Sequence, residues 1–210
     1  MKGLLPKLDP IDKLRTAIYL ADGIADIHAV GTNNSTNDKR SGSESNITAT
    51  LIHNDINMDN VLLGHRNGTM VPIFNDFNIA VFQKKNSETG EPCQFKGRFA
   101  NPQWMSPEQQ SKREDNLSTK SLNEKIDIYA LGNILFKIAV GNSPWKFDYD
   151  TKRITPELRE KIARAKLRGA KPKVPPEIRN STDPSIKAII NAMNKCYRND
   201  ADLRPSAREV

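Results

Sequence analysis

The feature that most constrains this fold is the stretch from 126 to 140, which is apolar on nearly all sides. A helix that is apolar all round is buried inside a larger structure and does not lie on its surface. Asp127, Asn133 and Lys137 interrupt the stretch, so it does not predict a membrane span. With 37% hydrophobic residues the chain can bury one sizeable core, and we expect a mainly α-helical single unit around this central helix.

Apolar residues at three- and four-residue spacing predict further helices before and after the central one. The first runs from near Pro10 to near Gly31. Its predicted buried face consists of Ile11, Leu14, Ile18, Ala21, Ala25 and His28. A basic helix is expected from about 156 to 168. The predicted buried face of the last helix consists of Ile186, Ile189, Ile190, Met193 and Tyr197. The polar stretch 32–48 has little apolar surface to bury, so it predicts a disordered insertion.

Two short apolar runs between the first and the central helix predict a β-hairpin. They cover 61–63 and 70–74, and they flank the dipeptide Asn67-Gly68, which favours the positive φ angles of hairpin turns. Pro72 has no backbone N–H to donate to a ladder, so the second strand is expected at a sheet edge.

The candidate chemistry lies in three segments, 53–60 (HNDINMDN), 75–78 (NDFN) and 104–108 (WMSPE). Asp55 can accept the proton of an attacking hydroxyl, because an alcohol is a poor nucleophile unless a positioned base takes its hydrogen bond. Asn60 and Asp76 offer the hard oxygen ligands that Mg²⁺ prefers, and the hairpin is expected to bring them to neighbouring strand ends. The ordered set predicts a phosphoryl-transfer site.

With these segments in view, the chain resembles the C-terminal lobe of a eukaryotic protein kinase from the first helix to Val210. The resemblance implies that residues 1–210 form a partial kinase domain. Its expected fold is mainly α, with a short β-hairpin that carries the catalytic and metal-binding loops. It implies an activation segment at 76–108. It also implies transfer of the γ-phosphoryl group of ATP to a Ser or Thr hydroxyl of a protein substrate, with Tyr less favoured and with a tyrosine-kinase-like flavour.

The resemblance also assigns roles to the site residues. Asp55 matches the catalytic aspartate. Asn60 and Asp76 match the residues that bind Mg²⁺ and thereby the phosphates of ATP, and Leu62 is placed with the cofactor-binding residues. ATP and Mg²⁺ are therefore the expected cofactors.

Five further residues have structural roles in the resemblance. His53 matches a histidine that packs beneath the phenylalanine matching Phe77, and Asp127 matches a helix aspartate that hydrogen-bonds the catalytic-loop backbone. Glu108 and Arg204 match a buried ion pair, in which loss of either partner leaves an unpaired buried charge.

Four asparagines depart from the family pattern. Asn54 replaces the arginine that in many kinases pairs with a phosphorylated activation loop, so activation is expected not to need that phosphorylation. Asn57 and Asn101 replace a lysine and a threonine that usually support the transferred phosphate. Asn78 replaces a glycine, a milder change because Asn tolerates left-handed backbone.

No glycine-rich loop or strand lysine of an N-terminal lobe can be identified in the sequence. We therefore expect a truncated fragment that turns over negligibly by itself.

Two other functions fit part of these observations. A pseudokinase or scaffold lobe is the first alternative. A small-molecule phosphotransferase resembling choline or aminoglycoside kinases is the second, although these lack the activation segment and the Arg204-Pro205 ending.

The net charge of +7 is concentrated in 152–173. This stretch predicts a solvated helix face or, alternatively, a docking surface for an acidic partner. Nucleic acid is not expected as a partner, because no aromatic residues alternate with the charges.

Cys93 and Cys196 lie in unlike contexts, which argues against a disulfide framework and favours a reducing, intracellular (cytoplasmic) setting.

Overall fold

The central helix α3 (Lys125–Val140) is buried along almost its whole length. The computed structural model describes residues 8–29, 51–66, 68–84, 86, 88–89, 93, 95, 101–114 and 122–210. Every side chain of α3 from Ile126 to Ala139 is buried. Gly141 ends the helix in a left-handed conformation with φ 82°, and its N–H donates to the carbonyl of Lys137 at 2.8 Å. The predicted central helix and its end are confirmed.

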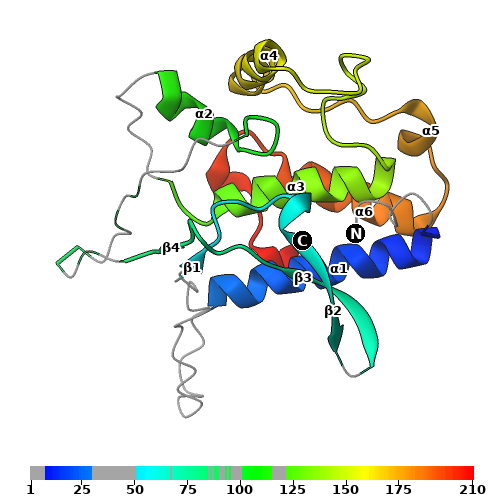
Figure 1. The fold of residues 1–210 in the computed structure, drawn as a ribbon, viewed down its shortest axis with the longest axis horizontal. Helices are drawn as coiled ribbons and strands as arrows, with labels where there is room; N and C mark the ends of the chain where they lie inside the picture. The colour runs from blue at the N-terminus through cyan, green and yellow to red at the C-terminus, as the bar shows by residue number, and fades with distance from the viewer. Residues whose placement is uncertain are drawn as a thin grey trace.

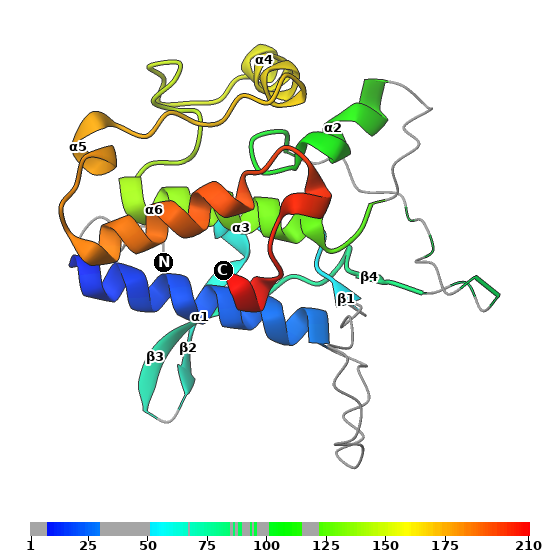
Figure 2. The same ribbon diagram turned by 180° about the vertical axis from the view of Figure 1, so that it is seen from behind.

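Two long helices, α1 (Pro10–Ala29) and α6 (Pro184–Cys196), lie beside α3, and Figures 1 and 2 show the three running along the long axis of the molecule. Their apolar side chains form one core with α3, in which Leu20, Ile134 and Ile189 are at most 1% exposed. Each such side chain contributes about 1.5–3 kcal/mol when it leaves water. The mainly α fold is therefore confirmed.

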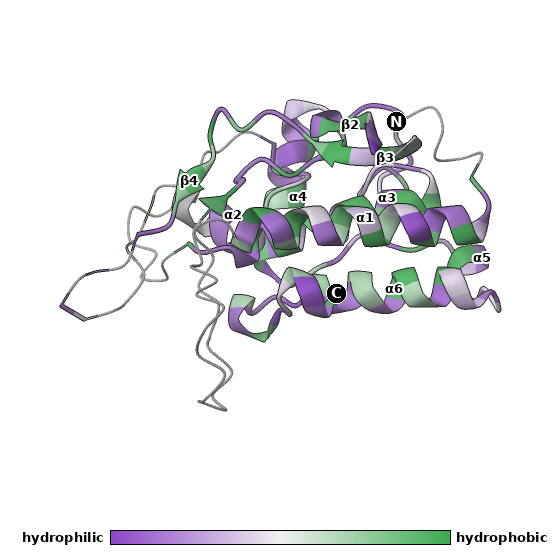
Figure 3. Cartoon of the chain, turned by 90° about the horizontal axis from the view of Figure 1, so that it is seen from below, coloured by the Kyte–Doolittle hydropathy of each residue, from purple (hydrophilic) through white to green (hydrophobic). Residues whose placement is uncertain are grey.

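The buried face of α1 differs from the predicted one. Ile11 and Ile18 are 57% and 51% exposed, so their placement in the core was wrong. The buried residues of α1 are Ala17, Leu20, Ala21, Ile24, Ala25 and His28. Small alanines on this face let the neighbouring helices approach closely. Both sides of α1 carry isoleucine, so the spacing of apolar residues alone could not show which side is buried. The surface of α1 seen in Figure 3 accordingly mixes hydrophobic and hydrophilic residues.

The predicted hairpin is formed by β2 (Val61–Arg66) and β3 (Thr69–Phe74), which projects from the helices (Figure 1). The register pairs Val61 with Phe74 and Leu63 with Pro72. Gly68 in the turn has φ 77°, which the Asn-Gly pattern predicts. The buried side chains of Val61 and Phe74 fix the base of the hairpin in the helical core.

A second strand pair, β1 (Leu51–Ile52) with β4 (Val81–Phe82), was not predicted. Each strand has only two residues, too few for an alternating pattern, and the partners lie far apart in the sequence. The loop 53–60 runs from β1 to β2 and is thus held at both ends by strand pairing.

The remaining helices, α2 (Pro107–Glu114), α4 (Pro156–Leu167) and α5 (Pro176–Arg179), lie on the other side of α3 from α1 (Figure 1). The predicted basic helix is α4, and eight of the nine basic side chains in 152–173 are exposed. Lys166 is the exception, with 0% exposure, so the prediction of a solvated face is wrong for this residue.

The predicted disordered insertion at 32–48 lies outside the described residues. Among the helices that are described, none is long and apolar enough to cross a membrane.

Candidate active site

The loop 53–60 is anchored by Asp127, in the first turn of α3. One carboxylate oxygen of Asp127 accepts the backbone N–H of His53 at 2.8 Å, and the other accepts that of Asn54 at 2.9 Å. Asn54 has a left-handed backbone with φ 65°. Such a conformation costs about 1–3 kcal/mol in a residue other than glycine, and the two bonds from Asp127 offset this cost.

Asp127 also bonds a residue that the motif analysis did not place in the site. The Nε2 atom of His28, near the end of α1, lies 3.1 Å from Oδ2 of Asp127. The helical spacing predicts that His28 is buried, but it cannot predict a partner 99 residues away. The catalytic loop is therefore tied through one carboxylate to both α3 and α1.

The side chain of Asp55 is held by two amides. Asn57 Nδ2 donates to Asp55 Oδ1 at 3.1 Å, and Asn60 Nδ2 donates to Asp55 Oδ2 at 3.0 Å. The same two nitrogens also donate to the backbone carbonyl of Asp55. Both carboxylate oxygens are thus oriented, and each keeps lone-pair capacity for a further donor such as an acceptor hydroxyl.

Asn60 directly precedes β2 and Asp76 follows β3 by two residues, at the end of the hairpin where the strands meet the loops. The N–H of Asn75 donates to the carbonyl of Asn60 at 2.9 Å, one step beyond the Val61–Phe74 pair. Asp76 is exposed and has φ 68°. Within the described part of the chain, both hydrogen bonds of the Asn60 side chain use its nitrogen, which leaves its amide oxygen for a cation. An amide oxygen and a carboxylate are donors that suit Mg²⁺.

His53 links the catalytic loop to the segment that carries Asp76. Its ring lies 4.6 Å from the ring of Phe77, tilted by 45°. Its Nε2 lies 3.1 Å from the carbonyl of Asn75, and its Nδ1 lies 3.4 Å from the N–H of Asp55. These partners assign the proton to Nε2, so His53 acts as a packing and bridging residue and not as a free base.

Asn54 links the start of the predicted activation segment 76–108 to α2, which follows the segment, through contacts without charge. Its Nδ2 donates to the carbonyl of Ile79 at 3.2 Å. Its Oδ1 accepts from Nε2 of Gln109, in α2, at 3.4 Å. Asn54 therefore holds the segment through neutral amide contacts.

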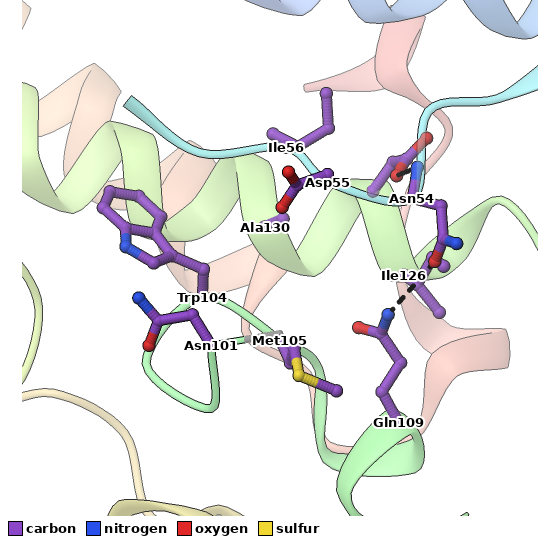
Figure 4. Close-up of a pocket in the computed structure, with 10 residues that line it drawn as sticks. Asn54, Asp55, Ile56, Asn101, Trp104, Met105, Gln109, Ile126 and Ala130 are labelled. Carbon is purple, nitrogen blue, oxygen red and sulfur yellow. Dashed lines mark hydrogen bonds between the residues drawn. The ribbon is translucent and has the colours of Figure 1, made fainter. Parts of the chain in front are cut away.

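A pocket opens beside Asp55 and is bounded by the loop 101–106. Figure 4 shows the Asp55 carboxylate pointing into this pocket, across from Asn101 and Trp104. About 20 Å³ is available there to the centre of a water molecule. That is room for about one small group, such as a hydroxyl, next to the carboxylate.

Arg204 and Glu108 form a two-point ion pair. Nη1 of Arg204 lies 2.6 Å from Oε1 of Glu108, and Nη2 lies 2.8 Å from Oε2. Arg204 is 2% exposed and also donates to the carbonyls of Lys125, Arg198 and Asn199. Its charge and donors are satisfied, and the start of α2 is fixed to the C-terminal segment.

Leu62 lies on the surface of the hairpin, two positions after Asn60. It is 51% exposed and pairs with Ile73, which is 47% exposed. The two side chains belong to an exposed apolar part of the hairpin next to Asn60.

Known proteins with similar sequences point to the same class of protein as the geometry of the site. Residues 47–210 match the family described as protein kinase domain. The chain is 24% identical over 160 residues to the MAP kinase kinase kinase mkh1 of Schizosaccharomyces pombe. It is 27% identical over 208 residues to a probable receptor-like protein kinase of Arabidopsis thaliana, and 25% identical over 152 residues to serine/threonine-protein kinase H1 of Homo sapiens.

These three matches cover 76%, 98% and 72% of the chain. They cover 12%, 21% and 29% of the three relatives, in the same order. The chain thus spans less than a third of the length of each of these relatives.

Proposed function

Because the chain belongs to the protein kinase family, we propose that it contributes the catalytic lobe for transfer of the γ-phosphoryl group of ATP to a Ser or Thr hydroxyl of a protein. The observation that carries the proposal is the Asp55 carboxylate, held by Asn57 and Asn60 at the edge of the pocket. The serine/threonine preference rests on the names of relatives such as serine/threonine-protein kinase H1.

In the proposed reaction, Asp55 accepts the hydrogen bond of the acceptor hydroxyl and orients its oxygen for attack. Positioning and charge stabilisation supply most of the catalysis in phosphoryl transfer. Asn60 and Asp76 would hold Mg²⁺ through an amide oxygen and a carboxylate, and Leu62, whose side chain is 51% exposed, would contribute an apolar surface for ATP. Magnesium, when bound, neutralises charge on the phosphates.

The test uses the longest natural form of the protein that contains these residues. Transfer of radiolabelled γ-phosphate to a protein acceptor is measured with Mg²⁺, for the wild type, Asp55→Asn and Asp202→Asn. Asp202 is an exposed carboxylate outside the loop 53–60 and provides the matched control. We expect Asp55→Asn to lower kcat by about 10²- to 10⁴-fold and Asp202→Asn to leave it within about twofold. Equal activity of Asp55→Asn and the wild type would refute the proposal.

A second candidate is a pseudokinase lobe that binds partners without transferring phosphate. The support for it is that Asn57 replaces the lysine, and Asn101 at the pocket replaces the threonine, that protein kinases usually have at these positions. In that case the same assay gives no Mg²⁺-dependent transfer for the wild type.

We also propose an acidic protein partner for the stretch 152–173, and an intracellular setting for the protein. Eight exposed basic side chains support the partner. A surface of this kind binds acidic ligands with strong salt dependence. The affinity of the chain for poly-glutamate at 50 and 300 mM NaCl tests this proposal; an affinity that does not fall with salt contradicts it.

The proposal of an intracellular setting is supported by the two cysteines, which are both free thiols. Localisation of the tagged protein in cells provides the test.

A further inference from the structure

The buried amine of Lys166 bonds the loop that faces Asp55 across the pocket. Its Nζ lies 2.9 Å from the carbonyl of Gln103 and 2.7 Å from that of Met105. The side chain is 0% exposed, unlike every other basic residue of the stretch 152–173. We propose that Lys166 is a positioning residue that sets the place of the acceptor hydroxyl by fixing the loop 101–106; this rests on the proposed kinase function.

The surroundings of Lys166 favour a donor at this point. The Nζ atom lies 5.0 Å from the ring centre of Tyr129 and 5.9 Å from that of Trp145, within range for an ammonium to interact with an aromatic face. Burial lowers the pKa of the amine. A neutral amine still has two N–H groups, one for each carbonyl, so the contact with the loop persists in both protonation states.

Lys166 is part of a wider set of contacts to the loop. Gln110 Nε2 in α2 donates to the carbonyl of Pro102 at 3.3 Å, and Asn133 Nδ2 in α3 donates to the carbonyl of Trp104 at 2.8 Å. With the two bonds from Lys166, four successive carbonyls, 102 to 105, accept from side chains of three helices. This segment is therefore fixed by buried side chains rather than by pairing with another strand.

The loop in turn shapes the pocket. Asn101, Trp104 and Met105 line it together with Asp55. With Lys166 removed, two buried carbonyls lack donors, and an opening of the loop toward water becomes favourable. The acceptor hydroxyl is then no longer positioned relative to Asp55. Asn60 and Asp76 flank the hairpin β2–β3, so their positions are expected to stay the same.

The first experiment measures hydrogen exchange in the 210-residue chain. The N–H groups of Trp104 and Met105 bond the carbonyl of Asn101 at 2.9 and 3.2 Å and report on the loop. In Lys166→Met we expect them to exchange about tenfold faster or more, while the amides of α3 stay within about twofold of the wild type. Lys161→Met, an exposed lysine of the same helix, is expected to change neither set. Unchanged exchange at Trp104 and Met105 in a folded Lys166→Met would overturn the proposal.

Should Lys166→Met fail to fold, exchange in the wild type under increasing urea decides the question. If Lys166 ties the loop to α4, the loop amides open together with those of α4 and with the same urea dependence. Opening of the loop at lower free energy and without α4 overturns the proposal.

The second experiment measures acceptor use in the longest natural form of the protein. Lys166→Met is expected to raise KM for the protein acceptor about tenfold and to leave KM for ATP within about twofold, since only the acceptor loop moves. Equal changes in both constants indicate a merely structural role and overturn the positioning role. Absence of transfer in the wild type contradicts the kinase function instead, and the exchange result then still establishes whether Lys166 fixes the loop.

Discussion

Gln109, in α2 just after the predicted activation segment 76–108, donates a hydrogen bond to the side chain of Asn54 at 3.4 Å, which connects α2 to the loop 53–60. Asn54 is also bonded to the start of the segment, because its side chain donates to the carbonyl of Ile79. Neither contact involves a charge. A phosphate on the segment would find an amide at the position of Asn54, where an arginine would form a much stronger, charge-assisted pair.

Activity is therefore expected to be independent of phosphorylation in the activation segment. Treatment of the longest natural form with a phosphatase should leave kcat within about twofold, whereas Asn54→Leu should lower it, because both amide contacts are lost. The measurement is phosphate transfer before and after treatment, with mass spectrometry of the segment. Loss of activity on dephosphorylation contradicts the prediction.

Replacement of Asp127 should weaken both the fold and the catalytic loop. Asp127→Leu leaves the buried N–H groups of His53 and Asn54 without acceptors, and each such group costs about 1–3 kcal/mol. We expect a loss of about 2–5 kcal/mol in the free energy of unfolding, measured with urea. The control is Asp202→Leu, at an exposed position, with an expected change within about 0.5 kcal/mol. Equal stabilities of the two variants would show that Asp127 does not anchor the loop.

The two cysteines should differ sharply in reactivity. Cys196 is 0% exposed, and burial raises the pKa of its thiol to about 12. The thiolate is the reactive form, so Cys196 should stay unmodified by iodoacetamide at pH 8 until the protein unfolds. Cys93 is exposed and should react in the native protein. Peptide mass mapping gives the sites, and native labelling of Cys196 would contradict its burial.

Lys166 should make stability depend on pH. Burial lowers its pKa well below the ordinary value; Glu108 opposes this shift and Arg204 adds to it. Between the lowered pKa and the ordinary value of about 10.4, the unfolded chain binds more protons at this site than the folded protein, so the free energy of unfolding rises with pH. Below this window the dependence vanishes, because the amine is charged in both states.

The measurement is urea unfolding at pH 7, 8 and 9 for the wild type, Lys166→Met and the control Lys161→Met. The stability of the wild type relative to Lys166→Met should increase with pH, by at most about 1.4 kcal/mol per unit. Lys161→Met should follow the wild type. Parallel curves for the wild type and Lys166→Met would contradict the prediction.

The sequence allowed local features to be predicted and left long-range ones open. The helix α3, its end at Gly141 and the hairpin turn at Gly68 follow from residue types and spacing within a few positions. The candidate site residues of 53–60 were selected from a motif of short, fixed spacing, and their catalytic and metal-binding roles stay predictions. In the structure the side chains of Asn57 and Asn60 both donate to the carboxylate of Asp55, which the spacing alone did not predict.

Partners brought together only by the folded chain could not be predicted. His28 meets Asp127 across 99 residues, and Lys166 meets Met105 across 61. Ile11 and Ile18 show the same limit in the core, because a helix with apolar residues on two sides needs its neighbours to decide which side is covered. A lysine in a basic helix gives no local sign that it is buried.

Asp127 and Asn133 hold two different loops from a single helix. Six positions at 1.5 Å each separate them by about 9 Å along the axis. In the proposed reaction, the first turn of α3 positions the loop that carries Asp55, and the middle of α3 positions the loop 101–106, which lines the pocket for the acceptor hydroxyl. A substitution near Asn133 is therefore expected to change acceptor use without displacing Asp55.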